Sequence, residues 1–359
     1  MSADTVKIKV VVWDLDNTVW HGTLTEGDEL VLRDNIRAIM EELDRRGVLQ
    51  SIASKNTHAD AWQRVQEFGL DHFFLYPQIN WGAKSESIAK IKELINIGFD
   101  AIAFFDDTAY ERDEVKFVHD EVQVYDVDQI AGMLDRPQFM PRFVTAESAQ
   151  RRLLYQADAQ RNEDSERFEN NQEFLRSLDM KFRVSAAVPE DLKRVEELTV
   201  RTNQLNATGY TYSYEELLEL LDSDEHQLYV AELVDRYGTY GKIGVALLER
   251  ADEDWRIKLL LMSCRVMARG VGTVLLNFLI NNARARNAGL AAEFKHTDRN
   301  RMMFMTYKFA GFKEAGELPG GGVMLEHALE ADGAYPDYIE LDLPPEPPFA
   351  GRPAPVVAG

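Results

Sequence analysis

The sequence predicts an α/β chain of two domains, in which a domain built on a parallel β-sheet precedes an α+β domain. Its 359 residues exceed the length at which a single hydrophobic core usually suffices, so two domains are expected. Within residues 1–130, short apolar runs alternate with helix-like segments, which indicates a mostly parallel sheet with helices on both faces. After residue 181 several strand-like runs follow one another, and this change of pattern favours an α+β domain.

The first domain is expected over residues 1–145, with four strands and three helices in alternation. Short apolar runs predict the strands, at 10–12, 48–53, 73–76 and 101–105. Helical periodicity predicts the helices, at 34–46, 58–68 and 84–97. A glycine follows each predicted helix, as expected where a residue in the left-handed conformation ends a helix. These glycines are Gly47, Gly69 and Gly98.

The second domain is expected over residues 181–330, after a polar helical connector at 146–180. Its strands are predicted at 182–187, 228–233, 243–248, 257–264 and 291–296. Its helices are predicted at 189–199, 270–286 and 301–310, and Pro189 opens the first of them. The tail, 331–359, holds seven of the twelve prolines. Because proline lacks a backbone N–H, we expect the tail to be extended and partly disordered.

Composition excludes several classes of function. The 61 acidic residues outnumber the 40 basic ones, which argues against nucleic acid as a partner. A single cysteine, Cys264, excludes an internal disulfide framework and a cysteine-rich zinc site, and it fits a reducing compartment. The N-terminal residues do not have the pattern of a signal peptide, and no run of about 18 apolar residues occurs. We therefore expect a cytoplasmic protein without a membrane partner.

Acidic residues follow the first predicted strand, where parallel sheets commonly bind ligands. Asp14 and Asp16 lie two positions apart at its carboxyl end. Two neighbouring carboxylates repel each other unless a cation lies between them or one is protonated. Mg²⁺ prefers such oxygen ligands, and a carboxylate can attack phosphorus to form an acyl phosphate. The second aspartate would then protonate the leaving oxygen and later activate water.

Three further segments supply the remaining parts of a phosphoryl-transfer site. Ser54 ends the second strand and can donate a hydrogen bond to a phosphoryl oxygen. Lys84 opens a helix, so its ammonium adds to the positive potential of the helix N-terminus. Asp106 and Asp107 follow the fourth strand and can complete a magnesium shell. Each feature alone also fits a helix cap or a turn, but the four in this order predict magnesium-dependent phosphoryl transfer.

These segments carry a resemblance to a known family. DLDNT, SKN, the lysine of WGAKSESI and FFDDTAYER resemble the four motifs of the HAD superfamily. WDLDNTVWHGTLTEGD and DDTAYER are similar to its capless subfamily IIIC, which contains FkbH-like proteins. In that family an asparagine and a proline usually follow the paired aspartates, whereas Thr108 and Ala109 stand here. The resemblance implies a capless HAD-type Rossmannoid domain whose open site can accept a large or protein-bound substrate.

The resemblance also implies roles for individual residues. By it, Asp14 is the nucleophile and Asp16 the general acid and base. The phosphoryl group is bound by Ser54, Asn56 and Lys84, and the Mg²⁺ ligands are Asp14, Asp16, Asp106 and Asp107. Trp20, His21 and Trp81 either line the entrance to this open site or pack within the domain.

Basic residues gather in the second domain. Residues 256–313 contain eleven basic and two acidic side chains, which indicates either exposed helix faces or an attraction for phosphate groups or an acidic partner. Within this segment the run Arg265 to Gly272 resembles the acyl-CoA pyrophosphate loop of GNAT acetyltransferases, which implies a GNAT-like domain. In that loop Arg265, Arg269, Gly270 and Gly272 would bind the anion. Met267 occupies a position that is usually polar, so the phosphopantetheine arm of an acyl carrier protein is expected there rather than acetyl-CoA.

Cys264 is the candidate nucleophile of the second domain. It is predicted at a strand end beside Arg265, with His296 on a neighbouring strand, and a nearby cation or histidine lowers the pKa of a thiol. RTNQLN at 201–206, LMSCRV at 261–266, and His296-Thr297 with Asn300 resemble the C-terminal part of FkbH-like proteins. That resemblance favours an acyl-carrying thiol over an inert buried cysteine. His296 is either its base or a structural histidine.

FkbH-like proteins are glyceryltransferase/phosphatases of polyketide and antibiotic biosynthesis. The resemblance implies that Cys264 takes the glyceryl unit of D-1,3-bisphosphoglycerate as a thioester. Dephosphorylation would occur at Asp14, and transfer to an acyl carrier protein would lead to methoxymalonyl-ACP or a related product. Three alternatives remain: a phosphatase whose second domain is a scaffold, an N-acetyltransferase with a vestigial first domain, and a non-enzymatic adaptor.

Overall fold

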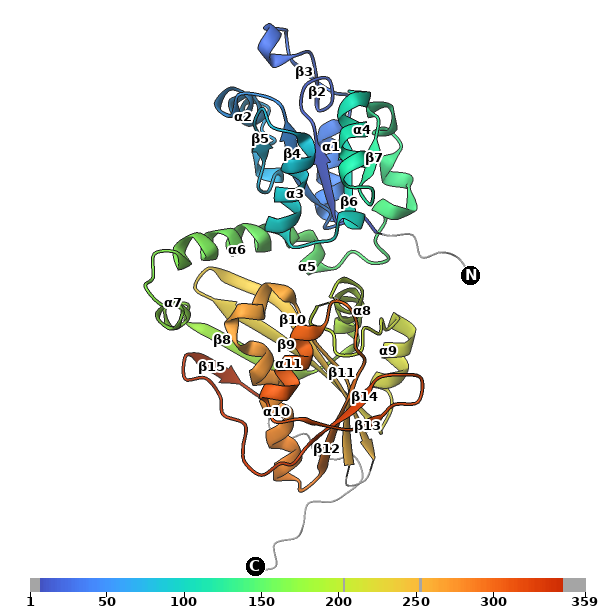
Figure 1. The fold of residues 1–359 in the computed structure, drawn as a ribbon, viewed down its shortest axis with the longest axis vertical. Coiled ribbons are helices and arrows are strands. Elements are labelled where there is room, and N and C mark those ends of the chain that lie inside the picture. Colours follow the sequence, from blue (N-terminus) through green and yellow to red (C-terminus); the bar gives the residue numbers. More distant parts are fainter. Residues whose placement is uncertain (1–6, 203, 252–253, 345–359) are drawn as a thin grey trace, which may run out of the picture. The chain divides into compact units, whose positions relative to one another are not determined.

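The fold is that of two compact units, of which the first ends at Ala159 and the second begins at Gln160 (Figure 1). The computed structural model describes residues 7–202, 204–251 and 254–344. The predicted fold class is confirmed, since a parallel α/β unit precedes an α+β unit built on a mixed sheet. Among the described residues, no helix combines the length and the apolar character needed to cross a membrane.

The first unit contains a five-stranded sheet of order β5-β4-β1-β6-β7, in which every pair of neighbours is parallel. All four residues of β1 are buried: Val10 and Val12 pack in one core, and Val11 and Trp13 pack in the other. A strand covered on both faces has no solvent-facing side, which explains its unbroken apolar sequence. The strands are β1 Val10–Trp13, β4 Leu49–Ser54, β5 Gln78–Ile79, β6 Ile102–Phe105 and β7 Gln123–Tyr125.

Helices cover both faces of this sheet. Buried residues of α1 and α2 belong to one core, and those of α3 and α4 belong to the other. In α1 the buried positions recur every three or four residues, as an amphipathic helix requires. The helices are α1 Ile36–Arg45, α2 His58–Glu67, α3 Lys84–Ile95 and α4 Ala109–Val118. The 3₁₀ helices are η1 Leu24–Glu26, η2 Asp71–Phe73, η3 Phe99–Ala101, η4 Val127–Gln129, η5 Met133–Asp135 and η6 Pro137–Phe139.

The strand predicted at 73–76 is wrong in position. Residues 71–73 form η2, Phe74 makes only an isolated bridge with Gln50, and the strand β5 begins at Gln78. The chain cannot stay extended here because Tyr76 has a φ of 51° and Pro77 follows it. Two short strands that the sequence analysis did not predict form a hairpin after β1. They are β2 Trp20–His21 and β3 Val31–Leu32.

Three helices occupy the segment predicted as a connector. They are α5 Ala146–Ala149, α6 Arg151–Ser165 and α7 Asn171–Ser177, and the division between the two units falls within α6. The start of this segment packs on the first unit at Gly47, whose carbonyl accepts a hydrogen bond from Arg151 at 2.6 Å. Gly47 has a φ of 69°, and a Cβ there would lie 2.3 Å from the Arg151 guanidinium. Glycine therefore both ends α1 and makes room for α6.

The second unit is built on an eight-stranded sheet of order β13-β14-β12-β11-β10-β9-β8-β15. Helices α8 and α9 pack on one face, while α10, α11 and α7 pack on the other (Figure 1). The helices are α8 Leu192–Arg201, α9 Tyr214–Leu221, α10 Val271–Ala285 and α11 Arg301–Phe309, with η7 Pro189–Asp191 and η8 Cys264–Arg269. The strands are β8 Met180–Ala186, β9 His226–Asp235, β10 Gly238–Ala251, β11 Asp254–Met262, β12 Gly289–Phe294, β13 Lys313–Glu317, β14 Val323–His327 and β15 Ile339–Asp342.

Strands β11 and β12 are parallel but pair only over their first residues, as far as Ile257 and Ala292. Beyond that point a separate segment, 205–207, lies between them. The N–H of Ala207 donates to the carbonyl of Leu260 at 3.0 Å, and the N–H of Lys295 donates to the carbonyl of Ala207 at 3.1 Å. The segment thus satisfies backbone groups that the divergence of the two strands would leave open.

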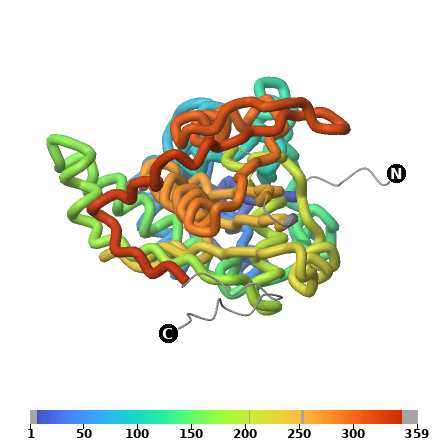
Figure 2. The backbone as a smooth tube through the Cα atoms, turned by 90° about the horizontal axis from the view of Figure 1, so that it is seen from below, coloured from blue at the N-terminus to red at the C-terminus, as the bar shows by residue number. Residues whose placement is uncertain are grey.

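The tail was expected to be extended and partly disordered, and its described part, 331–344, is an ordered segment that contains an extended strand. Strand β15 pairs in parallel with β8, from Ile339 beside Met180 to Asp342 beside Arg183. Before it, the chain is held along α10 (Figure 2), where Asn277 donates to the carbonyl of Ala334 at 2.6 Å. The open edge of β8 provides the hydrogen-bonding partners that order this part of the tail. The remainder of the predicted tail lies outside the described residues.

Candidate active site

The candidate site of the first unit lies where three parallel strands end. Asp14 follows β1, Ser54 is the last residue of β4, and Asp106 follows β6. The register places Trp13 beside both Ile52 and Phe105, so the next residues of the three strands emerge at one edge of the sheet. The side chains of Asp14, Ser54 and Asp106 are all buried. The sheet therefore brings together groups that are 40 to 92 positions apart in the chain.

Lys84 lies at the centre of this edge. Its Nζ is 2.5 Å from Asp14, 2.6 Å from Asp106 and 2.6 Å from Glu111. Lys84 is the first residue of α3, and its side chain is 3% exposed. A buried ammonium is tolerated only with charged partners, which the three carboxylates provide.

Burial shifts the titration of these groups. It raises the pKa of Asp14 to about 6, although Lys84 opposes the shift. Burial, together with the neighbouring Asp14 carboxylate, raises the pKa of Asp106 to about 7. Burial alone would lower the pKa of Lys84, but its carboxylate neighbours outweigh it and raise that pKa. Burial likewise opposes ionisation of Glu111, but Lys84 and Lys55 lower its pKa overall. The site thus holds more negative charge than Lys84 alone neutralises.

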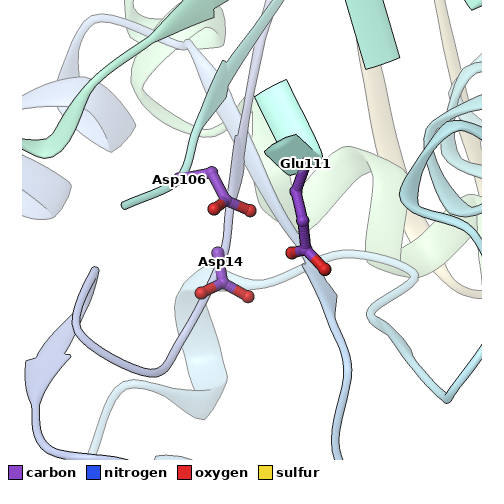
Figure 3. A group of neighbouring side chains, drawn as sticks. All are labelled: Asp14, Asp106 and Glu111. Atoms are coloured by element: carbon purple, nitrogen blue, oxygen red, sulfur yellow. The ribbon is translucent and has the colours of Figure 1, made fainter. Parts of the chain in front are cut away.

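The cluster has a donor set that fits a divalent cation. One oxygen from each of Asp14, Asp106 and Glu111 lies within 4.8 Å of the others, and Figure 3 shows these three neighbouring side chains. Hard divalent ions such as Mg²⁺ are bound by carboxylate oxygens of this kind. The raised pKa values of Asp14 and Asp106 arise mainly from burial, and a buried carboxylate is stabilised by either a proton or a cation.

Asp16 lies beside this cluster and is held by three donors. Its Oδ1 accepts hydrogen bonds from the Trp20 indole at 2.8 Å and from the backbone N–H of Leu24 at 3.2 Å. Its Oδ2 accepts one from the Asn56 amide at 3.1 Å. Three donors fix the orientation of this carboxylate. Trp20 is fully buried, so it does not line an entrance, whereas Trp81 is 64% exposed.

Asn56 links the first two motifs. Its amide nitrogen contacts both Asp16 and the Ser54 hydroxyl, the latter at 3.2 Å. Its buried Oδ1 has no hydrogen-bond partner among the described residues, which leaves an acceptor for a ligand group. A cavity of about 270 Å³ adjoins Asn56 and is also lined by Leu24 and Arg64.

The structure does not place all the predicted metal ligands in one group. It groups Asp14 and Asp106 with Glu111, while Asp16 is held by the donors described above. The carboxylate of Asp107 instead accepts a hydrogen bond from the Thr108 hydroxyl at 3.3 Å. The structure therefore brings two of the predicted ligands, Asp14 and Asp106, together and adds Glu111 to them, but does not group Asp16 and Asp107 with them.

Glu111 is the site residue that the sequence analysis missed. It lies in the first turn of α4, where an acidic side chain commonly stabilises the helix N-terminus. In the structure its carboxylate instead bridges Lys84 and Lys55, the latter at 2.8 Å. The neighbouring Arg112 donates to the carbonyl of Asp106 at 2.6 Å and thereby holds the loop that follows β6. The sequence feature that could have identified Glu111 is its position within the FFDDTAYER motif.

In the second unit, Cys264 is half-buried, forms no disulfide and begins η8 directly after β11. Arg265 donates to the carbonyl of Tyr240 at 2.7 Å, and Arg269 is buried over the ring of Phe174 at 5.2 Å. The ring of His296 contacts the rings of Phe294 and Phe304, and neither contact joins it to Cys264.

The predicted glycine loop opens α10. Gly270 has a φ of 79°, and a Cβ there would lie 2.7 Å from the Tyr338 hydroxyl, so the position requires glycine. Both Gly270 and Gly272 border a narrow slot of about 90 Å³ that is otherwise largely apolar, with Met262, Met267 and Met303 among its walls. The two arginines of the predicted anion loop do not line this slot.

The basic segment 256–313 does not form a uniformly positive surface. Arg256 contacts Glu249 at 3.2 Å, and Arg284 contacts Asp332 at 2.5 Å. Both acidic partners lie outside the segment, so a charge count along the sequence overstates its positive charge. Arg269 is also buried rather than presented to a partner.

Comparisons with known proteins give partial matches. Neither a protein-family model nor a curated protein matches the sequence. Among solved structures, the N-terminal part of the protein BF1531 from Bacteroides fragilis, containing a phosphatase domain complexed with Mg, is 27% identical. That match covers 37% of this chain and 40% of that chain, with a TM-score of 0.32.

Two N-acetyltransferases also match part of the chain. The ribosomal-protein-S18-alanine N-acetyltransferase of Escherichia coli is 15% identical, and the match covers 40% of this chain and 90% of that one, with a TM-score of 0.31. The PaiA N-acetyltransferase of Thermoplasma acidophilum, in complex with coenzyme A, is 15% identical over 41% of this chain and 98% of that one, with a TM-score of 0.33. These likenesses are too distant to assign an activity.

Proposed function

We propose that the first unit is a phosphatase that hydrolyses phosphate monoesters through Asp14. One observation carries the proposal: a buried lysine and three carboxylates meet where the parallel strands end. Phosphoryl transfer requires positioned cations around the phosphoryl oxygens and a nucleophile in line with the leaving group. Asp14 and Lys84 supply a nucleophile and a cation at this edge.

In the proposed reaction the Asp14 carboxylate attacks phosphorus, and the bond between phosphorus and the ester oxygen breaks. Asp16 gives a proton to the departing alkoxide, so an alcohol leaves and an acyl phosphate remains on Asp14. Asp16 then takes a proton from water, whose oxygen attacks phosphorus. The bond between phosphorus and the Asp14 oxygen breaks, so inorganic phosphate leaves and the Asp14 carboxylate is regenerated. The donors on Asp16, from Trp20 and Leu24, hold its carboxylate in place through both steps.

Asp14, Asp106 and Glu111 are the proposed ligands of Mg²⁺, which when bound offsets the negative charge of the phosphoryl oxygens. In this proposal the hydroxyl of Ser54, which contacts Asn56, and the ammonium of Lys84, which contacts Asp14, would bind the phosphoryl group. The ammonium of Lys84 has only three N–H donors. A phosphoryl oxygen that it binds would therefore replace a carboxylate partner.

Phosphate release from p-nitrophenyl phosphate tests this proposal. Asp14→Asn should lower the rate by about three orders of magnitude, because the amide cannot act as the nucleophile. Asp113→Asn provides the matched control, since Asp113 is exposed on the neighbouring helix α4 and should leave the rate unchanged. Equal rates in the two variants would rule out Asp14 as the nucleophile.

A finer proposal concerns the whole chain and rests on its resemblance to FkbH-like proteins. The Cys264 thiolate attacks the acyl carbon of D-1,3-bisphosphoglycerate, the bond from that carbon to the phosphate oxygen breaks, and inorganic phosphate leaves. The remaining 3-phosphate is hydrolysed at Asp14. The phosphopantetheine thiolate of an acyl carrier protein then attacks the thioester and releases the Cys264 thiolate. The slot of about 90 Å³ beside Gly270 supports this proposal only in part, since its small volume excludes a bulky group.

The intact mass of a carrier protein tests the finer proposal. After incubation with the enzyme, Mg²⁺ and 1,3-bisphosphoglycerate, the carrier should gain a glyceryl group. Asp14→Asn should instead yield the phosphoglyceryl adduct, and Cys264→Ala should yield neither. A Cys264→Ala variant that still loads the carrier would refute the thioester step, and phosphatase activity without loading would favour a phosphatase with a scaffold unit.

Binding of acetyl-CoA tests the alternative that the chain is an N-acetyltransferase. Micromolar binding of acetyl-CoA, together with full activity in Asp14→Asn, would favour an N-acetyltransferase.

Carrier docking is tested separately by Arg284→Glu combined with Arg286→Glu, which should weaken loading of an acidic carrier if this part of the surface receives it. Unchanged loading by that double variant would place the docking surface elsewhere.

A further inference from the structure

A large cavity lies in the second unit, bounded by α9 and the loop before it, by strands β9 to β12 and by the turn between β13 and β14. Its volume is about 700 Å³, which is in the range of pockets that bind metabolites. The side chains that give it chemical character are Tyr210, Tyr212, Arg256, Lys258, Glu293 and Lys295. The cavity is formed by residues of the second unit alone, so it is not part of the phosphoryl site.

Two buried asparagines shape one wall of the cavity. Asn206 is 1% exposed, accepts from the N–H of Gly209 at 2.9 Å and donates to the carbonyl of Tyr210 at 3.2 Å. Asn300 is fully buried and donates to the carbonyls of Lys295 at 2.9 Å and of Asn206 at 3.1 Å. Both residues belong to runs that the sequence analysis singled out without assigning a role. Their amides hold the loop and the end of β12 in a fixed arrangement.

The sheet is irregular at the cavity. Between β10 and β11 the pairing shifts register, because Leu248 pairs with Ile257 while Leu247 pairs with Leu259. Lys258 is therefore the extra residue of a β-bulge. Bulges redirect side chains and often occur beside binding sites. Here the bulge residue is one of the cations that line the cavity.

Another part of the lining is a turn of three consecutive glycines, 320–322, all with positive φ. A Cβ on Gly322 would lie 2.6 Å from the backbone carbonyl of Phe294, so only glycine lets the turn approach β12 this closely. Gly321 and Leu318 of this turn border the cavity. One part of the lining is thus held by asparagine amides, and another depends on glycines that lack a Cβ.

The charges of the cavity favour an anion. Arg256 and Lys258 share two carboxylates: Arg256 contacts Glu249 at 3.2 Å, and Lys258 contacts Glu293 at 2.7 Å. These four charges offset one another. Lys295 is exposed to the cavity and has no ion pair within the part of the chain that the structure describes. An uncompensated ammonium at the mouth of a partly enclosed cavity attracts negative groups.

Tyr212 adds a neutral donor. Burial raises the pKa of its phenol, so the hydroxyl keeps its proton at physiological pH and can donate a hydrogen bond. Its ring packs edge-to-face with Tyr210, at 4.6 Å between centroids. Apolar side chains, among them Leu220, Leu247 and Phe294, also line the cavity beside His226 and suit the carbon skeleton of a small molecule.

We propose that this cavity binds a small organic anion, a phosphate monoester or a carboxylic acid, with its acidic group at Lys295 and Tyr212 as a hydrogen-bond donor. This inference goes beyond the proposed phosphatase activity and does not depend on it. A ligand held here would occupy the second unit while the first unit carries out phosphoryl transfer.

Isothermal titration calorimetry on the full chain tests the inference. The Asp14→Asn variant prevents turnover at the proposed phosphatase site, and four probes are compared: 3-phosphoglycerate, glycerate, glycerol 3-phosphate and inorganic phosphate. Lys295→Glu in that background should weaken binding of 3-phosphoglycerate by about tenfold or more, since a charged hydrogen bond is lost and a repulsion is added. Lys313→Glu makes the same change of charge on an exposed lysine of β13 outside the cavity and should leave binding unchanged.

The probes distinguish the two sources of negative charge. Binding of glycerate that Lys295→Glu weakens assigns the site to carboxylates, and the same result with glycerol 3-phosphate assigns it to phosphate monoesters. Leu318→Trp, which fills the cavity from the glycine turn, should also weaken binding. The inference is overturned if the parent binds none of the probes, if Lys295→Glu and Lys313→Glu lose affinity equally, or if neither Lys295→Glu nor Leu318→Trp alters it.

Discussion

Replacing Lys84 with methionine would remove an ammonium that contacts all three carboxylates of the candidate site. Lys84 is 3% exposed, and its Nζ lies 2.5 to 2.6 Å from the oxygens of Asp14, Asp106 and Glu111. Methionine retains most of the side-chain volume, so the change is mainly one of charge. Breaking a buried ion pair from one side costs about 3–5 kcal/mol, because the partner charges remain buried. We expect the first unit to lose that amount of stability in the absence of Mg²⁺.

The same helix offers a matched control. Lys90 also lies on α3 and contacts Glu93 at 2.9 Å, but its side chain is 51% exposed. An exposed pair of this kind contributes about 0–1 kcal/mol, so Lys90→Met should have little effect. The two variants should therefore differ by about 3 kcal/mol in the free energy of unfolding.

Urea unfolding followed by tryptophan fluorescence measures this difference. Four of the five tryptophans lie in the first unit, so the signal reports mainly on it. With EDTA, Lys84→Met should unfold at a lower urea concentration than Lys90→Met with an unchanged slope. Mg²⁺ should restore part of the loss, because the ion can neutralise the carboxylates that Lys84 no longer contacts. Equal midpoints for the two variants in EDTA would refute the view that Lys84 neutralises a buried acidic cluster.

Three further outcomes are expected. Because the pKa values of Asp14 and Asp106 are raised from 3.8 to about 6 and about 7, the folded state binds more protons than the unfolded state in this range. The melting temperature in EDTA should therefore fall as pH rises through that window. The increase in melting temperature on adding Mg²⁺ should be larger at pH 7 than at pH 5. A melting temperature in EDTA that rises with pH would contradict the raised pKa values. Arg161 and Asp235 form a fully buried ion pair at 2.8 Å, so Arg161→Met should destabilise the second unit by about 3–5 kcal/mol in urea unfolding, and a loss below about 1 kcal/mol would contradict its burial. Gly322→Ala should lower the melting temperature of the second unit, since its φ of 111° and the nearby carbonyl both oppose a Cβ; an unchanged melting temperature would show that the turn can move.

The location of the candidate site was predictable because it depends on strand order alone. Once 10–12, 48–53 and 101–105 are recognised as parallel strands, Asp14, Ser54 and Asp106 must emerge at one edge of the sheet. The contribution of Glu111 was not predictable in this way. It depends on how the first turn of α4 is oriented above the sheet, and an acidic residue at that position has an ordinary role in capping a helix.

In the second unit, the features that could not be predicted are contacts between segments far apart in the sequence. Asn300 bonds to the carbonyl of Asn206, 94 positions away, and nothing in either local sequence indicates that pairing. The same limit applies to β15, whose partner β8 lies far upstream and whose proline-rich surroundings favoured an extended tail. Apolar periodicity identifies elements, but which open edge or cavity a distant segment fills depends on tertiary packing.

The most direct test of the account is to trap the phosphoryl group on the protein. The wild-type chain would be mixed with Mg²⁺ and a phosphate monoester, reduced with borohydride and digested, and the peptide containing Asp14 and Asp16 analysed by mass spectrometry. The account predicts reduction of residue 14 to homoserine, only when substrate is present, with residue 16 unmodified. Phosphate release without modification at Asp14, or modification at another carboxylate, would contradict it.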